Sequence, residues 1–151
     1  MMIRALLAIC TIPMAGFASE HLLGTWKLNL EESKYDGMPA PKDTIATYTA
    51  DGAGWKYEAK GTSGDGQPMN MSFAYVKDNE DIKFSGSPIG DTLVIRGGAS
   101  NVNTATFKRD GKVVGRGKRT ISKDGKRMTL TGNTTMADGK KAKWTAVYDK
   151  Q

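Results

Sequence analysis

Residues 110–139, DGKVVGRGKRTISKDGKRMTLTGNTTMADG, contain an Asp-Gly pair every 14 residues. Two further pairs, Asp51-Gly52 and Asp65-Gly66, stand at the same interval. Glycine readily takes the positive φ that a tight hairpin turn requires, so each pair predicts a hairpin. After a turn of about four residues, about ten remain for each strand, which is longer than the usual five or six. These repeats predict an all-β protein, an antiparallel up-and-down meander with little room for helices.

The segments between these turns alternate apolar and polar residues, as half-buried strands do. In the last segment Trp144 and Tyr148 share one face, while Lys143 lies on the other. The predicted strands are 23–29, 44–50, 55–61, 68–76, 81–85, 91–97, 102–108, 112–122, 127–135 and 141–149. Pro39 and Pro41 oppose a continuous helix between the first two strands. We therefore expect a loop from residue 30 to residue 43, placed to cap one end of the fold.

The two edge strands of such a meander would expose unpaired backbone groups to other chains. Pairing the first strand with the last removes both edges and closes the sheet into a barrel. With eight to ten strands, the interior of a barrel is either filled by side chains or holds a small ligand. A sandwich of two sheets is the structural alternative. The length of 151 residues fits one domain.

The N-terminal residues 1–18 have the three parts of an export signal. Arg4 gives the positive start, an uncharged apolar run follows, and small residues end it near Ala18. A membrane-spanning helix needs about 20 apolar residues, and this run is shorter and contains Pro13. We therefore predict a signal peptide, no stable membrane insertion, and a single mature domain over residues 19–151. The expected location is the bacterial periplasm or the exterior.

The composition of the mature chain excludes several classes of protein. The only cysteine of the sequence, Cys10, falls within the signal, so the mature chain has none and is not one of the small secreted scaffolds held by disulfides. Loss of Arg4 leaves a net charge of +5. The basic residues are spread along the chain, which favours a solvated outer face. Export argues against nucleic acid as a partner, and the expected state is a monomer.

Both ends of the mature chain resemble a known group of proteins. The opening LGTWKL of residues 23–28 resembles the Gly-x-Trp signature that begins the first strand of calycins, which comprise lipocalins and fatty-acid-binding proteins. The closing WTAVYDK of residues 144–150 resembles the Thr-Arg-Val-Tyr-Glu-Lys ending of fatty-acid-binding proteins. The whole pattern is similar to bacterial exported lipocalin-like proteins of largely unassigned role. The resemblance implies a calycin-like barrel with Trp26 packed across its closed end.

The departures from that group bear on function. Where fatty-acid-binding proteins have an arginine that helps to hold the ligand carboxylate, this chain has Ala146. Tyr148 matches the family tyrosine, but no helical lid is visible between the first two strands. Carboxylate capture of the usual kind is therefore not expected. Arg119, which shares a face with Ile121, either supplies a charge to the interior or lies on the outer face.

Enzyme and metal sites find little support in the sequence. The single histidine, His21, stands near the mature N-terminus, and no cluster of His, Cys or carboxylates suits zinc. The acidic segment at residues 78–81 has no calcium-loop pattern and is interpreted as a turn. We therefore predict no catalytic residue, no metal and no cofactor. An enzyme using Tyr, Arg and carboxylates at the mouth of a barrel is the weaker alternative.

A pocket for an apolar ligand is the better-supported site, because large aromatic side chains and adaptable methionines gather on one predicted face. The candidate ligand-binding residues are Trp55, Tyr57, Met71, Phe73, Tyr75, Arg119, Met128, Trp144 and Tyr148. The same set would also serve as a packed core. The predicted function is an exported, non-enzymatic binding protein for a small hydrophobic or amphipathic molecule. The alternative is an envelope-associated module that binds anionic polysaccharide or a partner protein through its basic exterior.

Overall fold

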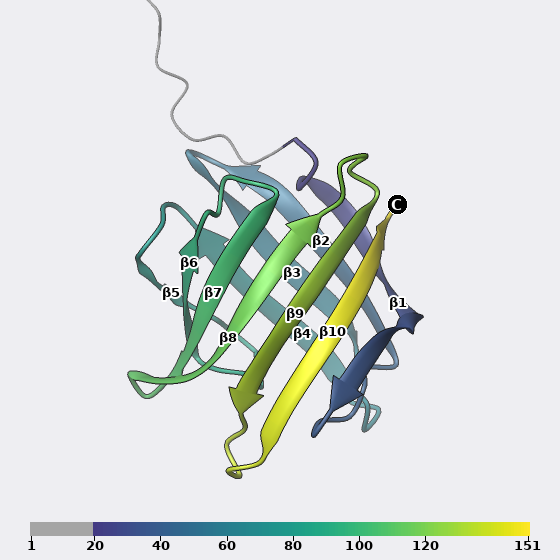
Figure 1. Cartoon of the computed structure of the whole chain (residues 1–151), viewed down its shortest axis with the longest axis vertical. Coiled ribbons are helices and arrows are strands. Elements are labelled where there is room, and N and C mark those ends of the chain that lie inside the picture. Colours follow the sequence, from purple (N-terminus) through teal and green to yellow (C-terminus); the bar gives the residue numbers. More distant parts are fainter. Residues whose placement is uncertain (1–19) are drawn as a thin grey trace, which may run out of the picture.

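A computed structural model describes residues 20–151, and the predicted signal peptide lies outside the described residues. Ten strands make up the described part of the chain (Figure 1). They are β1 (Gly24–Asp36), β2 (Asp43–Asp51), β3 (Gly54–Thr62), β4 (Pro68–Tyr75), β5 (Asp81–Lys83), β6 (Thr92–Arg96), β7 (Val102–Arg109), β8 (Lys112–Ile121), β9 (Arg127–Thr135) and β10 (Lys141–Lys150). Over residues 20–151 there is no helix long and apolar enough to cross a membrane.

The strands form one antiparallel sheet in the order β4-β3-β2-β1-β10-β9-β8-β7-β6-β5. The first and last strands pair, with Trp26 opposite Lys150. The two remaining edges, β4 and β5, meet where Ser72 and Ser85 exchange backbone hydrogen bonds of 3.0 and 2.9 Å. The sheet is thus rolled into a nearly closed, ten-stranded barrel (Figure 1). The predicted up-and-down meander closed into a barrel of eight to ten strands is confirmed, and the two-sheet alternative is wrong.

The five Asp-Gly pairs all lie at hairpin turns between consecutive strands. Their glycines have φ between +55° and +87°, in the left-handed region that the predicted turns require. At the turn between β7 and β8, Asp110 also has a positive φ of 51°. Two successive residues of this kind form the type I′ turn, whose twist matches that of the flanking strands. The hairpin turns predicted from the Asp-Gly pairs are therefore confirmed at all five positions.

The predicted loop from residue 30 to residue 43 is wrong, because β1 continues to Asp36. Its pairing with β10 shifts between Asn29 and Lys34. Ser33 holds this bulge: its Oγ donates to the Asn29 carbonyl at 2.6 Å and accepts from the Val147 backbone N–H at 2.9 Å. The bulge then places Tyr35 opposite Trp144. The connection to β2 is only residues 37–42, without a helix.

One end of the barrel is solid. Trp26 and Leu22 are fully buried there, and the Trp26 indole N–H donates to the Leu22 carbonyl at 2.9 Å. The ammonium of Lys150 lies 5.0 Å from the centre of the Trp26 ring. This closed end carries the turns β2–β3, β4–β5, β6–β7 and β8–β9, together with the C-terminus, toward the top of Figure 1. Trp26 therefore packs across the closed end, as the resemblance implied.

Candidate ligand-binding site

The opposite half of the barrel encloses a cavity of about 450 Å³. Its outer rim is formed by loops at the end away from Trp26, with Met38 and Pro39 from the β1–β2 loop and Ile89 and Met136 from two others. Specific pockets for small molecules measure about 300–1,000 Å³. The interior is therefore neither fully packed nor a wide channel, and its size suits one small molecule.

Aromatic side chains line one wall of this cavity. Tyr57 and Phe73 lie opposite each other on β3 and β4, and their ring centres are 4.8 Å apart. The Phe84 ring meets Phe73 edge-on at 5.2 Å. Met71, one step along β4, lies half-buried beside them. Such a wall supplies a large apolar surface of defined shape, against which an apolar body is removed from water.

The structure brings six of the nine candidate residues together around the cavity. They are Tyr57, Met71, Phe73, Arg119, Trp144 and Tyr148. The other three, Trp55, Tyr75 and Met128, are buried but do not line it. Each lies at the closed end, where the interior is filled. The alternation of the strands therefore predicts correctly that these side chains point inward, but the position along the barrel decides which of them border a space.

Trp55 and Tyr75 belong to a network that closes the floor. Their rings stack at 5.0 Å, and the Trp55 indole N–H donates to the Gly98 carbonyl at 2.9 Å. The Asp78 carboxylate accepts from the backbone N–H groups of Gly97 and Gly98 at 2.9 and 3.1 Å, and from the Tyr75 hydroxyl at 2.8 Å. The two backbone donors hold the pKa of Asp78 below its usual range. The hydrogen bonds of Trp55 and Asp78 to Gly97 and Gly98 thus hold the β6–β7 turn in place below the cavity.

Arg119 reaches the cavity from the floor, and its side chain is buried, with 3% exposure. Its Nη2 donates to the Ser100 carbonyl at 3.1 Å. The Asn103 side-chain oxygen, in the amide orientation that satisfies both partners, lies 3.2 Å from each Nη. The guanidinium carbon is 5.2 Å from the Trp55 ring and 5.8 Å from the Tyr48 ring. Of the two positions left open by the sequence, the outer face is wrong.

The charge of Arg119 is not neutralised within the described residues. No Asp or Glu of residues 20–151 forms an ion pair with it, and its Nε has no hydrogen-bond partner. Burial lowers the pKa of the guanidinium from its usual value, but an arginine remains protonated in proteins. A buried polar donor without a partner costs free energy. An anion placed at the floor would balance the charge of the guanidinium.

Three buried tyrosines add neutral polar groups to the cavity. Burial raises the pKa of Tyr48, Tyr57 and Tyr148, so their hydroxyls stay protonated at neutral pH. At Tyr48, the nearby charge of Arg119 offsets part of that rise. Within residues 20–151 no group of three His, Cys, Asp or Glu is placed to hold a metal ion. The arrangement therefore suits binding and orientation of a ligand by hydrogen bonds.

Several lining residues were not among the candidates. Tyr35 lines the cavity only because the bulge in β1 turns it inward, and no local pattern announces that bulge. Tyr48 lies on the inward face of β2 beside Ala46, so strand alternation was a usable signal for it. Asn103 sits directly opposite Arg119 on β7. The sequence signal for Asn103 was a polar residue at an inward position of a predicted strand.

Comparison with known proteins bears on the fold alone. No family model matches the chain, and no curated protein matches it. Among solved structures it is similar to lobster apocrustacyanin A1, with 10% identity and a TM-score of 0.44, over 87% of this chain and 61% of that chain. It is also similar to a zebrafish ileal bile acid-binding protein complexed with cholic acid, with 11% identity and a TM-score of 0.42, over 87% and 99% of the two chains. The chain thus spans less than two thirds of the apocrustacyanin chain.

Proposed function

We propose that this protein is a non-enzymatic binding protein that holds one small amphipathic molecule, with an acidic group at Arg119 and an apolar body along the aromatic wall. The observation that carries the proposal is a buried cation without a carboxylate partner at the floor of an apolar cavity of about 450 Å³. Hydrogen bonds to charged groups contribute about 1.5–3 kcal/mol, more than neutral ones. The acidic group therefore sets the orientation of the ligand.

The apolar part of the ligand supplies the remaining driving force. Phe73 and Met71 offer a wall of aromatic and flexible side chains, and each Å² of apolar surface removed from water contributes about 25 cal/mol. Met38 at the rim adds a further adaptable contact. The ligand thus enters from the loop end, with its charge leading and its apolar tail toward the mouth.

The proposed place of action is outside the cytoplasm, and the proposed state is a monomer. The signal-like pattern of residues 1–18 supports export to the bacterial periplasm or beyond. Among the residues that line the cavity, Arg119 is the only buried charged side chain. Its guanidinium donates hydrogen bonds and stays protonated at neutral pH, so it suits binding of an anion rather than the role of a general base.

Competition binding with a matched pair of ligands tests the proposal. A fluorescent fatty-acid analogue is bound first, and then displaced with a fatty acid or with the alcohol of the same chain length. We expect the acid to bind more tightly than the alcohol. Arg119→Gln should weaken acid binding by about 10- to 100-fold, the equivalent of one charged hydrogen-bonding group, and leave alcohol binding nearly unchanged.

The control is Arg96→Gln, which removes an exposed arginine on β6 outside the cavity. It changes the net charge by the same amount and should leave both affinities as they are. If neither ligand displaces the analogue, or if both arginine variants weaken acid binding equally, the proposed function is wrong.

A further inference from the structure

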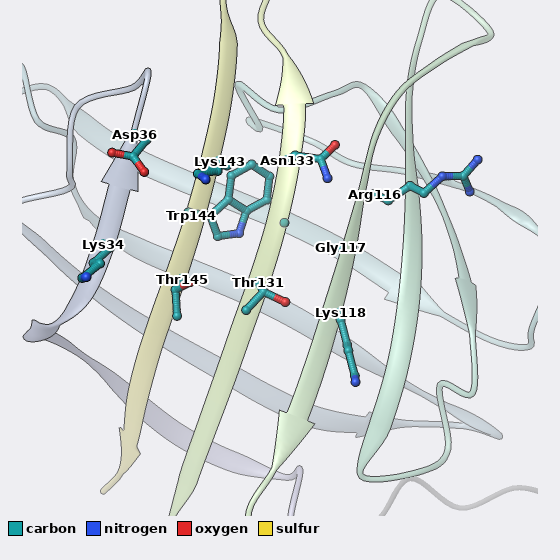
Figure 2. Close-up of a pocket in the computed structure, with 11 residues that line it drawn as sticks. Lys34, Asp36, Arg116, Gly117, Lys118, Thr131, Asn133, Lys143, Trp144 and Thr145 are labelled. Carbon is teal, nitrogen blue, oxygen red and sulfur yellow. The ribbon is translucent and has the colours of Figure 1, made fainter.

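A second hollow, of about 650 Å³, lies on the outside of the barrel over β8, β9, β10 and the end of β1 (Figure 2). We call it the outer groove. The register of the strands arranges its outward-facing side chains in two rows across the sheet. One row is Lys118, Thr131, Thr145 and Lys34, and the other is Arg116, Asn133, Lys143 and Asp36. Both rows thus consist of polar and charged residues.

The shape of the outer groove follows from the size of these side chains. Thr131 and Thr145 in the middle are short, whereas the lysines at the ends of their row are long. Beneath them Gly132 has no side chain, and the Trp144 indole lies against it so closely that a Cβ there would be 2.4 Å from Cζ2. The groove therefore has a floor of hydroxyl, amide and backbone groups and the half-buried Trp144 indole, and Lys34, Lys118 and Arg116 stand at the ends of the two rows (Figure 2).

Four cations, Lys34, Arg116, Lys118 and Lys143, face one carboxylate, Asp36, in the outer groove. None of the four forms an ion pair among residues 20–151. Elsewhere in the described part of the chain some basic residues are paired, such as Arg127 with Glu32 and Asp149, and others, such as Lys56 and Lys83, are not. The outer groove thus gathers four cations and one carboxylate around one hollow, an excess of three positive charges.

We propose that the outer groove binds an acidic polysaccharide. Charge complementarity requires an anionic partner, and the threonine hydroxyls and the Asn133 amide between the cations match the hydroxyl groups of sugars. Lys118 and Lys34 are separated by three strand spacings, about 14 Å, so the groove spans more than a single sugar. The outer groove and the cavity share Gly117, Lys118, Thr131 and Trp144 in their linings, but binding in the groove does not depend on the proposed cavity function.

Other anionic partners fit the outer groove less well. The exposed large hydrophobic residues of the described chain are Leu30, Ile45, Val76, Val102 and Val113. None of them lines the groove, and its one aromatic lining residue, Trp144, is half-buried, so the groove lacks the exposed apolar anchors that insert into a lipid surface or form the centre of a protein interface. A hydroxylated chain with regularly spaced acidic groups uses the polar floor as well as the cations.

Calorimetric titration with oligomers of galacturonic acid tests this proposal, with neutral dextran, polyglutamate and anionic phospholipid vesicles as parallel probes. We expect galacturonate oligomers to bind, dextran not to bind, and the other two to bind more weakly. Arg116→Gln combined with Lys143→Gln should lower the affinity for galacturonate by about tenfold, because each exposed charge pair contributes up to about 1 kcal/mol.

The matched control is Lys56→Gln combined with Lys83→Gln, two exposed lysines on β3 and β5 outside the groove. It should change the affinity less than twofold, and the fluorescent fatty-acid analogue should bind the cavity of both double variants as in the wild type. Equal losses of affinity for galacturonate in the two double variants would show that the oligomers respond to the overall positive charge of the surface and not to the groove, and would overturn the proposal. So would tighter binding of polyglutamate or vesicles than of galacturonate, or no binding at all.

Discussion

The two ends of the barrel are built from the same strands but differ in what their inward side chains do. At the closed end, Trp26, Leu22 and Met128 have no exposed surface, and Trp55 has 1%. At the open end Met71, Phe73 and Trp144 remain half-buried, because they border the cavity. Apart from Leu22, which precedes β1, both groups come from inward positions of alternating strands. Alternation therefore determines which way a side chain points, whereas the opposing strands determine whether it meets another side chain or a space.

The largest expected effect is the difference in stability loss between replacing a tryptophan at the closed end and replacing one at the open end. Trp26→Ala removes a fully packed ring together with its hydrogen bond to Leu22, and we expect a loss of about 3–5 kcal/mol of unfolding free energy. Trp144→Ala removes a half-buried ring beside an existing space, and we expect about 1–2 kcal/mol. Guanidinium unfolding measures both. Equal losses would mean that the open end is packed as tightly as the closed end.

A smaller effect should come from adding a single methyl group at each end. A Cβ at Gly98 would lie 2.4 Å from two ring carbons of Tyr75, and one at Gly132 would lie 2.4 Å from the Trp144 ring. Tyr75 is held by Asp78 and stacked on Trp55, so we expect Gly98→Ala to cost about 1–3 kcal/mol, as overpacking does.

Gly132→Ala should cost less than Gly98→Ala, because the Trp144 indole can tilt into the cavity. Displacement of the indole predicts a shift in tryptophan fluorescence and weaker binding of a fatty-acid analogue. If Gly132→Ala proves the more damaging of the two substitutions, Trp144 is fixed in place and the contrast between the ends fails.

The strands and turns were predictable because their determinants are local. An Asp-Gly pair specifies its own backbone conformation, and alternation within one strand specifies its inward face. The bulge after Asn29 was not predictable, because it depends on Ser33 bonding to Val147, which is more than a hundred residues away. Because the bulge was not predicted, the position of Tyr35 in the cavity wall was not predicted either. Sequence reasoning therefore located the ten strands but misplaced one end of β1.

The candidate site was predictable only as a set of inward residues. Arg119 lay on an alternating segment, but whether its neighbours offered a carboxylate depended on β7 and on the β6–β7 turn. The structure places Asn103 and the Ser100 carbonyl there instead. Likewise, nothing local distinguishes Tyr75, which is held at the floor, from Phe73 two residues before it, which borders the cavity. The division between core and cavity is a property of the closed barrel.

The smallest expected effect concerns alkaline pH and again compares depth in the barrel. Burial raises the pKa of Tyr57 well above its ordinary value of 10.0, and raises that of Tyr35, nearer the mouth, to about 12. In the unfolded chain both phenols lose their protons near pH 10.0, while in the native protein they keep them. The unfolded state therefore binds fewer protons above that pH, so stability is fully present below pH 10.0 and falls as the pH rises further.

Replacing either tyrosine by phenylalanine should flatten that alkaline loss of stability. Tyr57→Phe should flatten it more, because the loss due to Tyr35 ends near pH 12, whereas the window for Tyr57 extends further. Between pH 10.0 and about pH 12 both variants should change the slope alike, and above about pH 12 only Tyr57→Phe should still do so; unfolding free energies measured across both ranges for the wild type and the two variants give the comparison. An equal change in slope for both variants above about pH 12 would show that Tyr57 is hydrated like Tyr35, and that water reaches the deep part of the cavity as freely as its mouth.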